Sequence, residues 1–233
     1  MYCLAGLVAG LLMPPLKLPL LEGSNLGGKE LERVYTASLD GWTALDFHRQ
    51  VDGLGSTLII GETESGARLG GYCPTGWESR DDYRASPRAF LFFRCEPEAC
   101  DDEEEGWHVC RVLGPGDIAI FDYARGGPQF GAADLVIGPP QTPVMGGLAG
   151  PENDSPEYMQ RTAGDLRIVK SSLGGSYEKA PAGTSFPAGP LVELEAYCNA
   201  AFAPGSGLRV GKAAASQAQE EEGALPKPGW WPF

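Results

Sequence analysis

The segments GWTALDFHRQVDG (41–53), TLIIGETESGARLGGYCPTGWES (57–79) and AFLFF (89–93) decide how this chain folds. The first segment has the polar start and apolar spacing of a short helix that ends at Gly53. The second carries β-branched and apolar residues on both sides of a short turn containing Gly66, which is typical of a β-hairpin. The third is a short apolar run, and it predicts a central strand.

The predicted helix has a clear start. Thr43 can act as its N-cap, and Asp46 three residues later completes an arrangement that is similar to a capping box. Ala44, Phe47 and Val51 are spaced so that they share one face of the helix. We therefore expect this face to pack against the rest of the domain.

Strand signals dominate the remainder of the domain. Residues 118–122 and 135–137 are short apolar runs, and residues 191–198 alternate between an apolar and an acidic face. Many strands with few helices favour a mainly β fold, a two-sheet antiparallel β-sandwich flanked by a few short helices. In the alternating segment the expected buried residues are Val192, Leu194, Ala196 and Cys198, and the outward ones are Glu193, Glu195 and Tyr197.

Composition and charge narrow the classes of partner and compartment that we expect. The chain has 233 residues, which suits one domain with extensions, and a net charge of -13, which argues against a nucleic-acid partner. Its six cysteines follow no repeating framework, so we expect free thiols in a reducing compartment. A monomer is the default expectation for so acidic a chain.

The chain divides into a domain and two extensions. We expect the domain at residues 22–199, with loop inserts at 96–106 and 139–163, and a flexible tail at 200–233. Residues 1–21 are mostly apolar but too short for a stable membrane span, and they lack the charged start of a signal peptide. We interpret them as a packing helix or part of a truncated upstream region, with a signal or anchor as the alternative.

Two sets of side chains offer catalytic chemistry. His48 can serve as a general base near neutral pH, but it would need an orienting carboxylate and a nucleophile. Asp46 and Asp52 are near it in sequence only, and no nucleophile motif accompanies it. Glu193 and Glu195 lie roughly 7 Å apart on one strand face, a spacing compatible with hydrolysis by paired carboxylates. A structural histidine and a solvated acidic face are the favoured interpretations, and no catalytic residue is predicted.

A metal or cofactor is not expected. Cys95, Cys100, His108 and Cys110 can be written as C-x4-C-x7-H-x-C, but structural zinc sites prefer paired cysteines at closer spacing. No glycine-rich phosphate loop stands between a strand and a helix, so nucleotide binding is not predicted.

Five blocks, at 41–53, 57–79, 89–93, 126–138 and 176–198, occur in an order that resembles the TLDc domain family. The resemblance implies a two-sheet sandwich flanked by helices. It also implies a regulator rather than a proven enzyme. The motif residues for which a structural role is expected are Gly41, Trp42, Phe47, His48, Asp52, Gly70, Gly71, Trp77, Phe90, Gly127, Pro128, Phe130, Gly131, Asp134 and Tyr177.

The resemblance also implies a function. TLDc proteins are described as protecting cells against oxidative damage, and several bind the vacuolar-type proton ATPase (V-ATPase). We therefore expect a cytoplasmic regulatory interaction domain whose protein partner is the V-ATPase peripheral stalk, with the nucleus or endomembrane surfaces as other locations. The candidate interaction residues are Glu178, Glu193, Glu195, Trp230, Trp231 and Phe233.

Two features keep alternatives open. The terminal Trp-Trp-Pro-Phe sequence is costly to leave in water, so it is expected to dock on a partner or to fold back on its own domain. Exposed aromatic side chains could instead make the sandwich a ligand- or carbohydrate-binding module. The favoured interpretation is that the aromatic residues are core residues: Trp42, Trp77, Phe90, Phe92, Phe130 and Tyr177.

Overall fold

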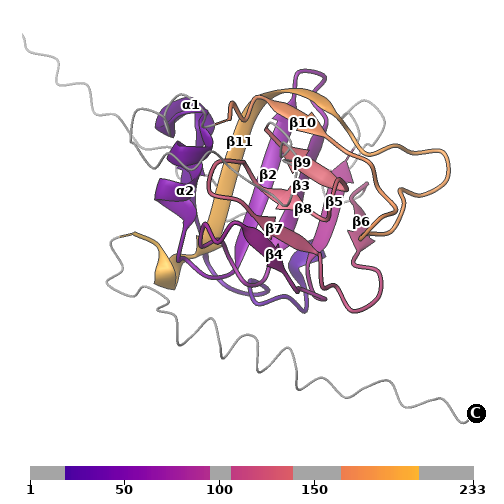
Figure 1. Cartoon of the computed structure of the whole chain (residues 1–233), viewed down its shortest axis with the longest axis horizontal. Coiled ribbons are helices and arrows are strands. Elements are labelled where there is room, and N and C mark those ends of the chain that lie inside the picture. The colour runs from indigo at the N-terminus through magenta and orange to yellow at the C-terminus, as the bar shows by residue number, and fades with distance from the viewer. Residues whose placement is uncertain (1–18, 95–105, 139–163, 205–233) are drawn as a thin grey trace, which may run out of the picture.

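The computed structural model describes residues 19–94, 106–138 and 164–204 (Figure 1). These ranges form eleven strands, two α-helices and two short 3-10 helices, which confirms the predicted mainly β fold. The helices are η1 (Pro19–Leu21), α1 (Ala37–Asp40), α2 (Ala44–Val51) and η3 (Ala200–Phe202). The strands are β1 (Leu31–Thr36), β2 (Thr57–Thr63), β3 (Arg68–Cys73), β4 (Asp82–Arg84), β5 (Phe90–Arg94), β6 (His108–Arg111), β7 (Ile120–Asp122), β8 (Gln129–Phe130), β9 (Leu135–Ile137), β10 (Ile168–Lys170) and β11 (Gly189–Asn199).

Several expectations lie outside the described residues. They concern the N-terminal segment up to residue 18, the inserts at 96–105 and 139–163, and the tail from residue 205. Trp230, Trp231 and Phe233 belong to that tail. Among the helices of the described ranges, none is long and apolar enough to cross a membrane.

Hydrogen bonds join the strands into one antiparallel path, in the order β4-β7-β8-β9-β10-β11-β2-β3-β5-β6, with β1 paired to β11 outside it. The long strand β11 connects the two halves of this path. Its first residues, Gly189 and Pro190, pair with β10, residues 191–198 pair with β2, and residues 195–199 pair with β1 on the other side. Because β11 pairs with β10 in one half of the path and with β2 in the other, the expected division into two separate sheets is not confirmed.

The main core lies where the two halves of the path meet. Figure 1 shows β7, β8 and β9 crossing β2 and β3, and side-chain contacts agree with this view. A Cβ on Gly71 of β3 would come within 2.5 Å of the Phe130 ring of β8. The ring centroids of Trp77 and Phe130 are 5.8 Å apart. The backbone of β3 and the Phe130 ring thus approach closely at Gly71, which lets an aromatic side chain fill the core.

The predicted helix is α2, and its start is as expected. Thr43 Oγ1 accepts a hydrogen bond from the Asp46 backbone, and the Asp46 carboxylate accepts one from the Thr43 backbone, which completes a capping box. Ala44, Phe47 and Val51 are buried. The short helix α1 was not predicted, because four residues carry too little periodic signal.

The alternation predicted for residues 191–198 is wrong at its first residue. Leu194 and Ala196 are buried as expected, but Val192 is 49 % exposed. The pairing with β2 shifts register between Leu191 and Glu193, so Leu191 takes the inward position instead. A register shift of this kind exchanges the inward and outward positions of the residues before it, and a rule of strict alternation cannot predict it.

Candidate functional site

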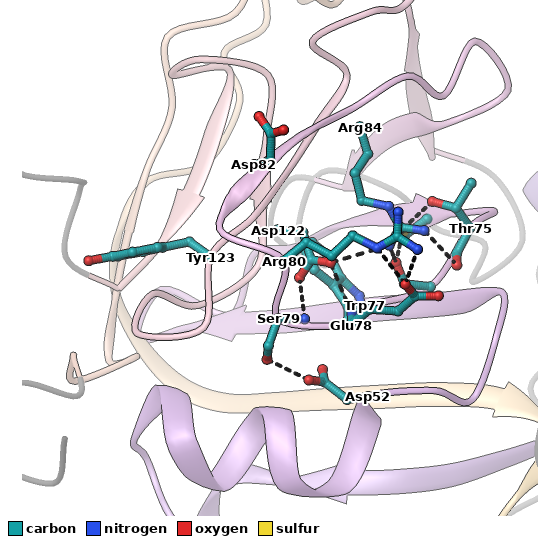
Figure 2. A network of polar contacts seen from close by, with 12 residues as sticks. Asp52, Thr75, Trp77, Glu78, Ser79, Arg80, Asp82, Arg84, Asp122 and Tyr123 are labelled. Atoms are coloured by element: carbon teal, nitrogen blue, oxygen red, sulfur yellow. Dashed lines mark hydrogen bonds and ion pairs between the residues drawn. The ribbon is translucent and has the colours of Figure 1, made fainter. Parts of the chain in front are cut away.

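A network of polar side chains lies between the end of α2, the segment from β3 to β4, and the end of β7 (Figure 2). Asp52 caps the C-terminus of α2, and Asp122 is the last residue of β7. Residues 75–80 lie between them. Figure 2 shows Ser79 pointing toward Asp52, whereas Asp82 and Tyr123 point away from the network. The cluster therefore joins three segments that are distant in sequence.

His48 anchors the helix side of this cluster. Its side chain is 5 % exposed, and its Nδ1 lies 2.7 Å from Asp52 Oδ1, one helical turn further along. Its Nε2 lies 3.0 Å from the Tyr123 carbonyl oxygen and 3.1 Å from that of Gly126. Burial lowers the pKa of His48, but the hydrogen bond and charge of Asp52, the charge of Asp122 and the Gly126 carbonyl outweigh it and raise the pKa overall.

Ser79 connects the two carboxylates. Its hydroxyl donates to Asp52 Oδ2 over 2.5 Å, and its backbone N–H donates to Asp122 Oδ1 over 3.0 Å. The neighbouring Glu78 N–H donates to Asp122 Oδ2 over 2.9 Å. The segment before β4 is thus attached to the end of α2 and to the end of β7.

Arg84 and Asp122 form a buried ion pair. Their side chains are 5 % and 0 % exposed, and Arg84 Nη1 lies 3.3 Å from Asp122 Oδ2. The guanidinium also donates to the carbonyl oxygens of Gly76 and Thr75, over 2.6 and 3.3 Å. Burial raises the pKa of Asp122, and the charge of Arg84 opposes that shift. Removal of either partner would leave a buried charge without compensation.

Two residues of this segment have unusual backbone conformations. Ser79 and Asp81 have φ angles of 54° and 56°, in the left-handed region that residues other than glycine seldom adopt. Each such residue costs about 1 kcal/mol or more unless its surroundings hold it. Ser79 is held by the two carboxylates, and Asp81 Oδ1 accepts a hydrogen bond from the Ala124 N–H over 2.8 Å.

The cluster does not form a hydrolytic site. The hydrolase hypothesis required His48 to meet a carboxylate, and Asp52 meets it. However, both ring nitrogens of His48 are already engaged, one by Asp52 and one by backbone carbonyls. Among the described residues, no serine, threonine or cysteine side chain makes a hydrogen bond to either nitrogen. The arrangement can hold segments together, but it offers no base to a substrate.

The structure places Glu193 and Glu195 together on the outward side of β11. Glu193 accepts hydrogen bonds from the Ser38 hydroxyl and N–H over 2.5 and 3.1 Å. Glu195 pairs with Arg33 at 2.5 Å and accepts from the Tyr197 hydroxyl. The arginine neutralises part of the charge on the expected acidic face.

Glu178 lies elsewhere. Its carboxylate accepts the backbone N–H of Arg111 in β6, and β6 is separated from β11 by β2, β3 and β5. The three candidate glutamates therefore do not form one surface. Only Glu193 and Glu195 are adjacent.

A second buried carboxylate holds another loop. Asp134 Oδ1 accepts the backbone N–H groups of Gly174, Gly175 and Tyr177, and Oδ2 accepts that of Ser176. All four distances lie between 2.9 and 3.2 Å. Asp134 thus binds the loop before Tyr177 to the start of β9, a structural role that its place in the sequence motif had not specified.

Most motif residues are packing residues. Trp77 is fully buried, and its Nε1 donates to Thr57 Oγ1 over 3.0 Å. Trp42 is half-buried beneath the Arg167 guanidinium, which lies 4.8 Å from the ring centroid. Burial of the other aromatics counts against a sugar platform made from them. The buried motif residues are Phe47, His48, Gly70, Gly71, Trp77, Phe90, Gly127, Pro128, Phe130, Gly131, Asp134 and Tyr177, whereas Gly41, Trp42 and Asp52 are partly exposed.

The described cysteines are buried free thiols: Cys73, Cys110 and Cys198. Burial raises the pKa of each thiol to about 11, so few of them are thiolates near neutral pH. Cys95 and Cys100 of the possible zinc pattern lie outside the described residues, and the ring of His108 packs on Phe93. Within the described ranges no three histidine, cysteine or acidic side chains cluster as metal ligands.

Sequence reasoning missed three members of the polar cluster: Ser79, Arg84 and Asp122. Their signals were weak, since Arg84 lies in a three-residue strand and Asp122 simply follows an apolar pair. The one usable signal was Asp122 itself, because a polar residue that ends an apolar strand needs a hydrogen-bond partner if it is buried.

Comparison with known proteins places the chain in a family. No curated protein matches it. A family model described as the TLDc domain matches residues 19–195, a range that contains α1, α2, the polar cluster and all but the last residues of β11. On this match, which extends over most of the sequence, the chain belongs to the TLDc domain family.

Proposed function

We propose that this chain is a non-enzymatic regulatory domain that binds the V-ATPase peripheral stalk and thereby contributes to protection against oxidative stress. Membership of the TLDc family indicates a regulatory or protective domain that interacts with other proteins, and TLDc domains are generally non-catalytic. The observation that carries the proposal is that neither ring nitrogen of His48 is available to a substrate. Both nitrogens of the best candidate base bind the protein's own groups, so the cluster serves as a scaffold.

Such a function needs no chemical step. A rigid domain that binds one assembly state of the pump better than another shifts the equilibrium between the states by its differential affinity. A difference of about 3 kcal/mol changes the ratio of states by more than a hundredfold. The place of action proposed here is the cytoplasm, where the peripheral stalk is accessible.

The three cysteines in the described part of the chain favour an indirect form of protection. Cys73, Cys110 and Cys198 are buried, and the pKa of each thiol is raised, which makes these cysteines poor scavengers of oxidants. Changed activity of the pump would protect cells without any reaction at a cysteine of this domain.

The proposed contact surface is the outward side of β11 and β2. Glu193 lies opposite Glu62 of β2 in the strand register. Glu62 and Glu195 each pair with an arginine, whereas Glu193 accepts hydrogen bonds from uncharged donors: the Ser38 hydroxyl and N–H and the Leu194 N–H. Glu193 is therefore the carboxylate on this surface that offers its full charge to a basic partner.

Affinity purification of the tagged chain from its own cells, followed by mass spectrometry, tests the proposal. We expect stalk subunits with the unmodified chain and at least about tenfold less with Glu193→Lys, because a reversed charge repels a basic partner. Asp117→Lys is the control, since Asp117 is an exposed acid in the turn before β7.

Two other results would change the proposal. Loss of the subunits with Glu178→Lys but not with Glu193→Lys would move the contact to the β6 edge. Absence of stalk subunits with the unmodified chain, across several nucleotide and salt conditions, would contradict pump binding.

A further inference from the structure

The ring of His48 faces hydrogen-bond acceptors on both sides. Nδ1 faces the Asp52 carboxylate, and Nε2 faces the carbonyl oxygens of Tyr123 and Gly126, at distances of 2.7, 3.0 and 3.1 Å. A neutral imidazole has one N–H and one lone pair, so it would direct its lone pair at one of these acceptors. The imidazolium has two N–H groups and satisfies both sides.

The charges of the two ion pairs His48–Asp52 and Arg84–Asp122 balance only when His48 is protonated. Asp52 and Asp122 supply two negative charges, and Arg84 supplies one positive charge. The imidazolium supplies the second positive charge. A neutral ring would leave one net negative charge among side chains of which three are almost fully buried, which is unfavourable in a medium of low polarity.

The remaining charged groups near this ring have partners of their own. On α2, Arg49 pairs with Asp46 at 3.4 Å. In the segment before β4, Arg80 pairs with Glu78 at 2.5 Å. The loop after β7 contributes Arg125, whose guanidinium lies 5.7 Å from the Tyr123 ring centroid. The apolar side of the His48 ring packs against Phe47.

We propose that protonated His48 is a latch that holds residues 78–82 against the end of α2, and that loss of its proton releases them. The connection runs from His48 to Asp52 and from Asp52 to the Ser79 hydroxyl. A neutral ring directs its lone pair either at Asp52 Oδ1 or at the carbonyl oxygens of Tyr123 and Gly126, and in both tautomers Asp52 loses the positive charge that holds it in place beside Ser79. Because Ser79 and Asp81 have left-handed backbones, the segment relaxes when its support weakens.

The latch has a defined direction with pH. The pKa of His48 in the folded protein is raised above its ordinary value, because Asp52, Asp122 and the Gly126 carbonyl together outweigh the lowering by burial. The latch is therefore fully closed below about pH 6.5, the pKa of a free histidine. It opens as the pH rises through the higher folded value. Opening changes the exposed surface of Arg80, Asp81 and Asp82.

Nuclear magnetic resonance of the ring nitrogens tests the protonation state directly. The chain has two histidines, so His108→Gln leaves His48 as the one imidazole signal. We expect both nitrogens of His48 to stay protonated to a higher pH than those of a free histidine, which loses its proton near about pH 6.5. A titration of His48 at or below that pH would overturn the proposal.

Hydrogen exchange tests the latch itself. The backbone N–H groups of Glu78 and Ser79 donate to Asp122, so their protection reports whether the segment is in place. We expect their protection, relative to amides of β2 and β3, to fall about tenfold as the pH passes through the His48 titration. A constant ratio across that titration would overturn the latch.

Two variants separate the steps. Ser79→Ala keeps His48 protonated but breaks the connection to Asp52, so the pH dependence of exchange in residues 78–82 is expected to vanish. Asp52→Asn removes the charge beside Nδ1, and the titration of His48 is expected to move to lower pH. Unchanged pH dependence in Ser79→Ala, or an unchanged His48 titration in Asp52→Asn, would contradict the proposed connection. His108→Gln serves as the control in both measurements.

Discussion

Asp122 and Asp134 are both buried carboxylates, 0 % and 1 % exposed, yet they are held in different ways. Asp134 receives only backbone N–H groups, from residues 174–177. Asp122 receives two backbone N–H groups and the charged side chain of Arg84, and it lies near protonatable His48. The first carboxylate holds a loop through donors that never titrate. The second belongs to a cluster of charges, so its loop can respond to pH and to the loss of one partner.

The largest effect is expected from Asp122→Ala. This change leaves the Arg84 charge buried without its carboxylate, and it removes the acceptor of two N–H groups. We expect the free energy of unfolding in urea to fall by about 3–5 kcal/mol. Asp117→Ala, at an exposed acid, should stay within about 0.5 kcal/mol of the unmodified protein. Similar free energies of unfolding for the two variants would show that the Asp122 carboxylate does not stabilise the fold.

A slightly smaller effect is expected from Asp134→Ala, which strips four N–H groups of their acceptor and costs about 2–4 kcal/mol. Asparagine substitutions distinguish the two carboxylates more sharply than alanine substitutions do. Three of the four donors converge on Oδ1, and the oxygen of asparagine can still accept them. Urea denaturation should therefore show most stability restored by Asp134→Asn but little by Asp122→Asn, because Arg84 needs a charge. Equal rescue at both positions would contradict the comparison.

The effect of His48→Gln should depend on pH. The raised pKa means that the protonated ring stabilises the folded protein below about pH 6.5, and that this contribution is lost as the pH rises through the folded value. We expect a loss of about 1.5–3 kcal/mol at pH 6, typical of hydrogen bonds to a charged group, and a smaller loss at high pH. Unfolding curves at several pH values provide the measurement. A loss of stability in His48→Gln that grows as the pH rises would contradict a raised pKa of His48.

The smallest effect concerns the strained backbone of Ser79. Ser79→Ala removes the hydroxyl that binds Asp52 but keeps the left-handed residue, and it should cost about 1 kcal/mol. Ser79→Gly loses the same hydroxyl but relieves the strain, so it should be the more stable variant by about 1 kcal/mol. Thermal unfolding of the pair is sufficient. Equal stability would mean that the φ of 54° carries no strain.

Much of the fold could be predicted from local patterns. The predicted hairpin lies within residues 57–79, the strand at 135–137 has the predicted boundaries, and α2 begins at the predicted N-cap Thr43. These features depend on residues within a few positions of one another, such as Thr43 and Asp46. The chain itself therefore carries the whole signal for them.

Much of the candidate site could not be predicted. His48 and Asp52 are one helical turn apart, so their pairing was within reach of a sequence argument. Asp122 lies 38 residues from Arg84 and 43 from Ser79, and nothing local indicates that they meet. The partners of Glu193 and Glu195 likewise come from α1 and β1, which changed an expected acidic surface into a partly neutralised one.

By itself the sequence determined the mainly β composition of the domain, the capped helix, the hairpin and the family resemblance. Only the tertiary structure decided that β11 joins both halves of the sheet, that Val192 faces outward, and that His48 lies between acceptors alone. The physical reason is the range of the interactions. Caps and alternation act between neighbours along the chain, whereas buried charges depend on which distant segments the packed strands bring together.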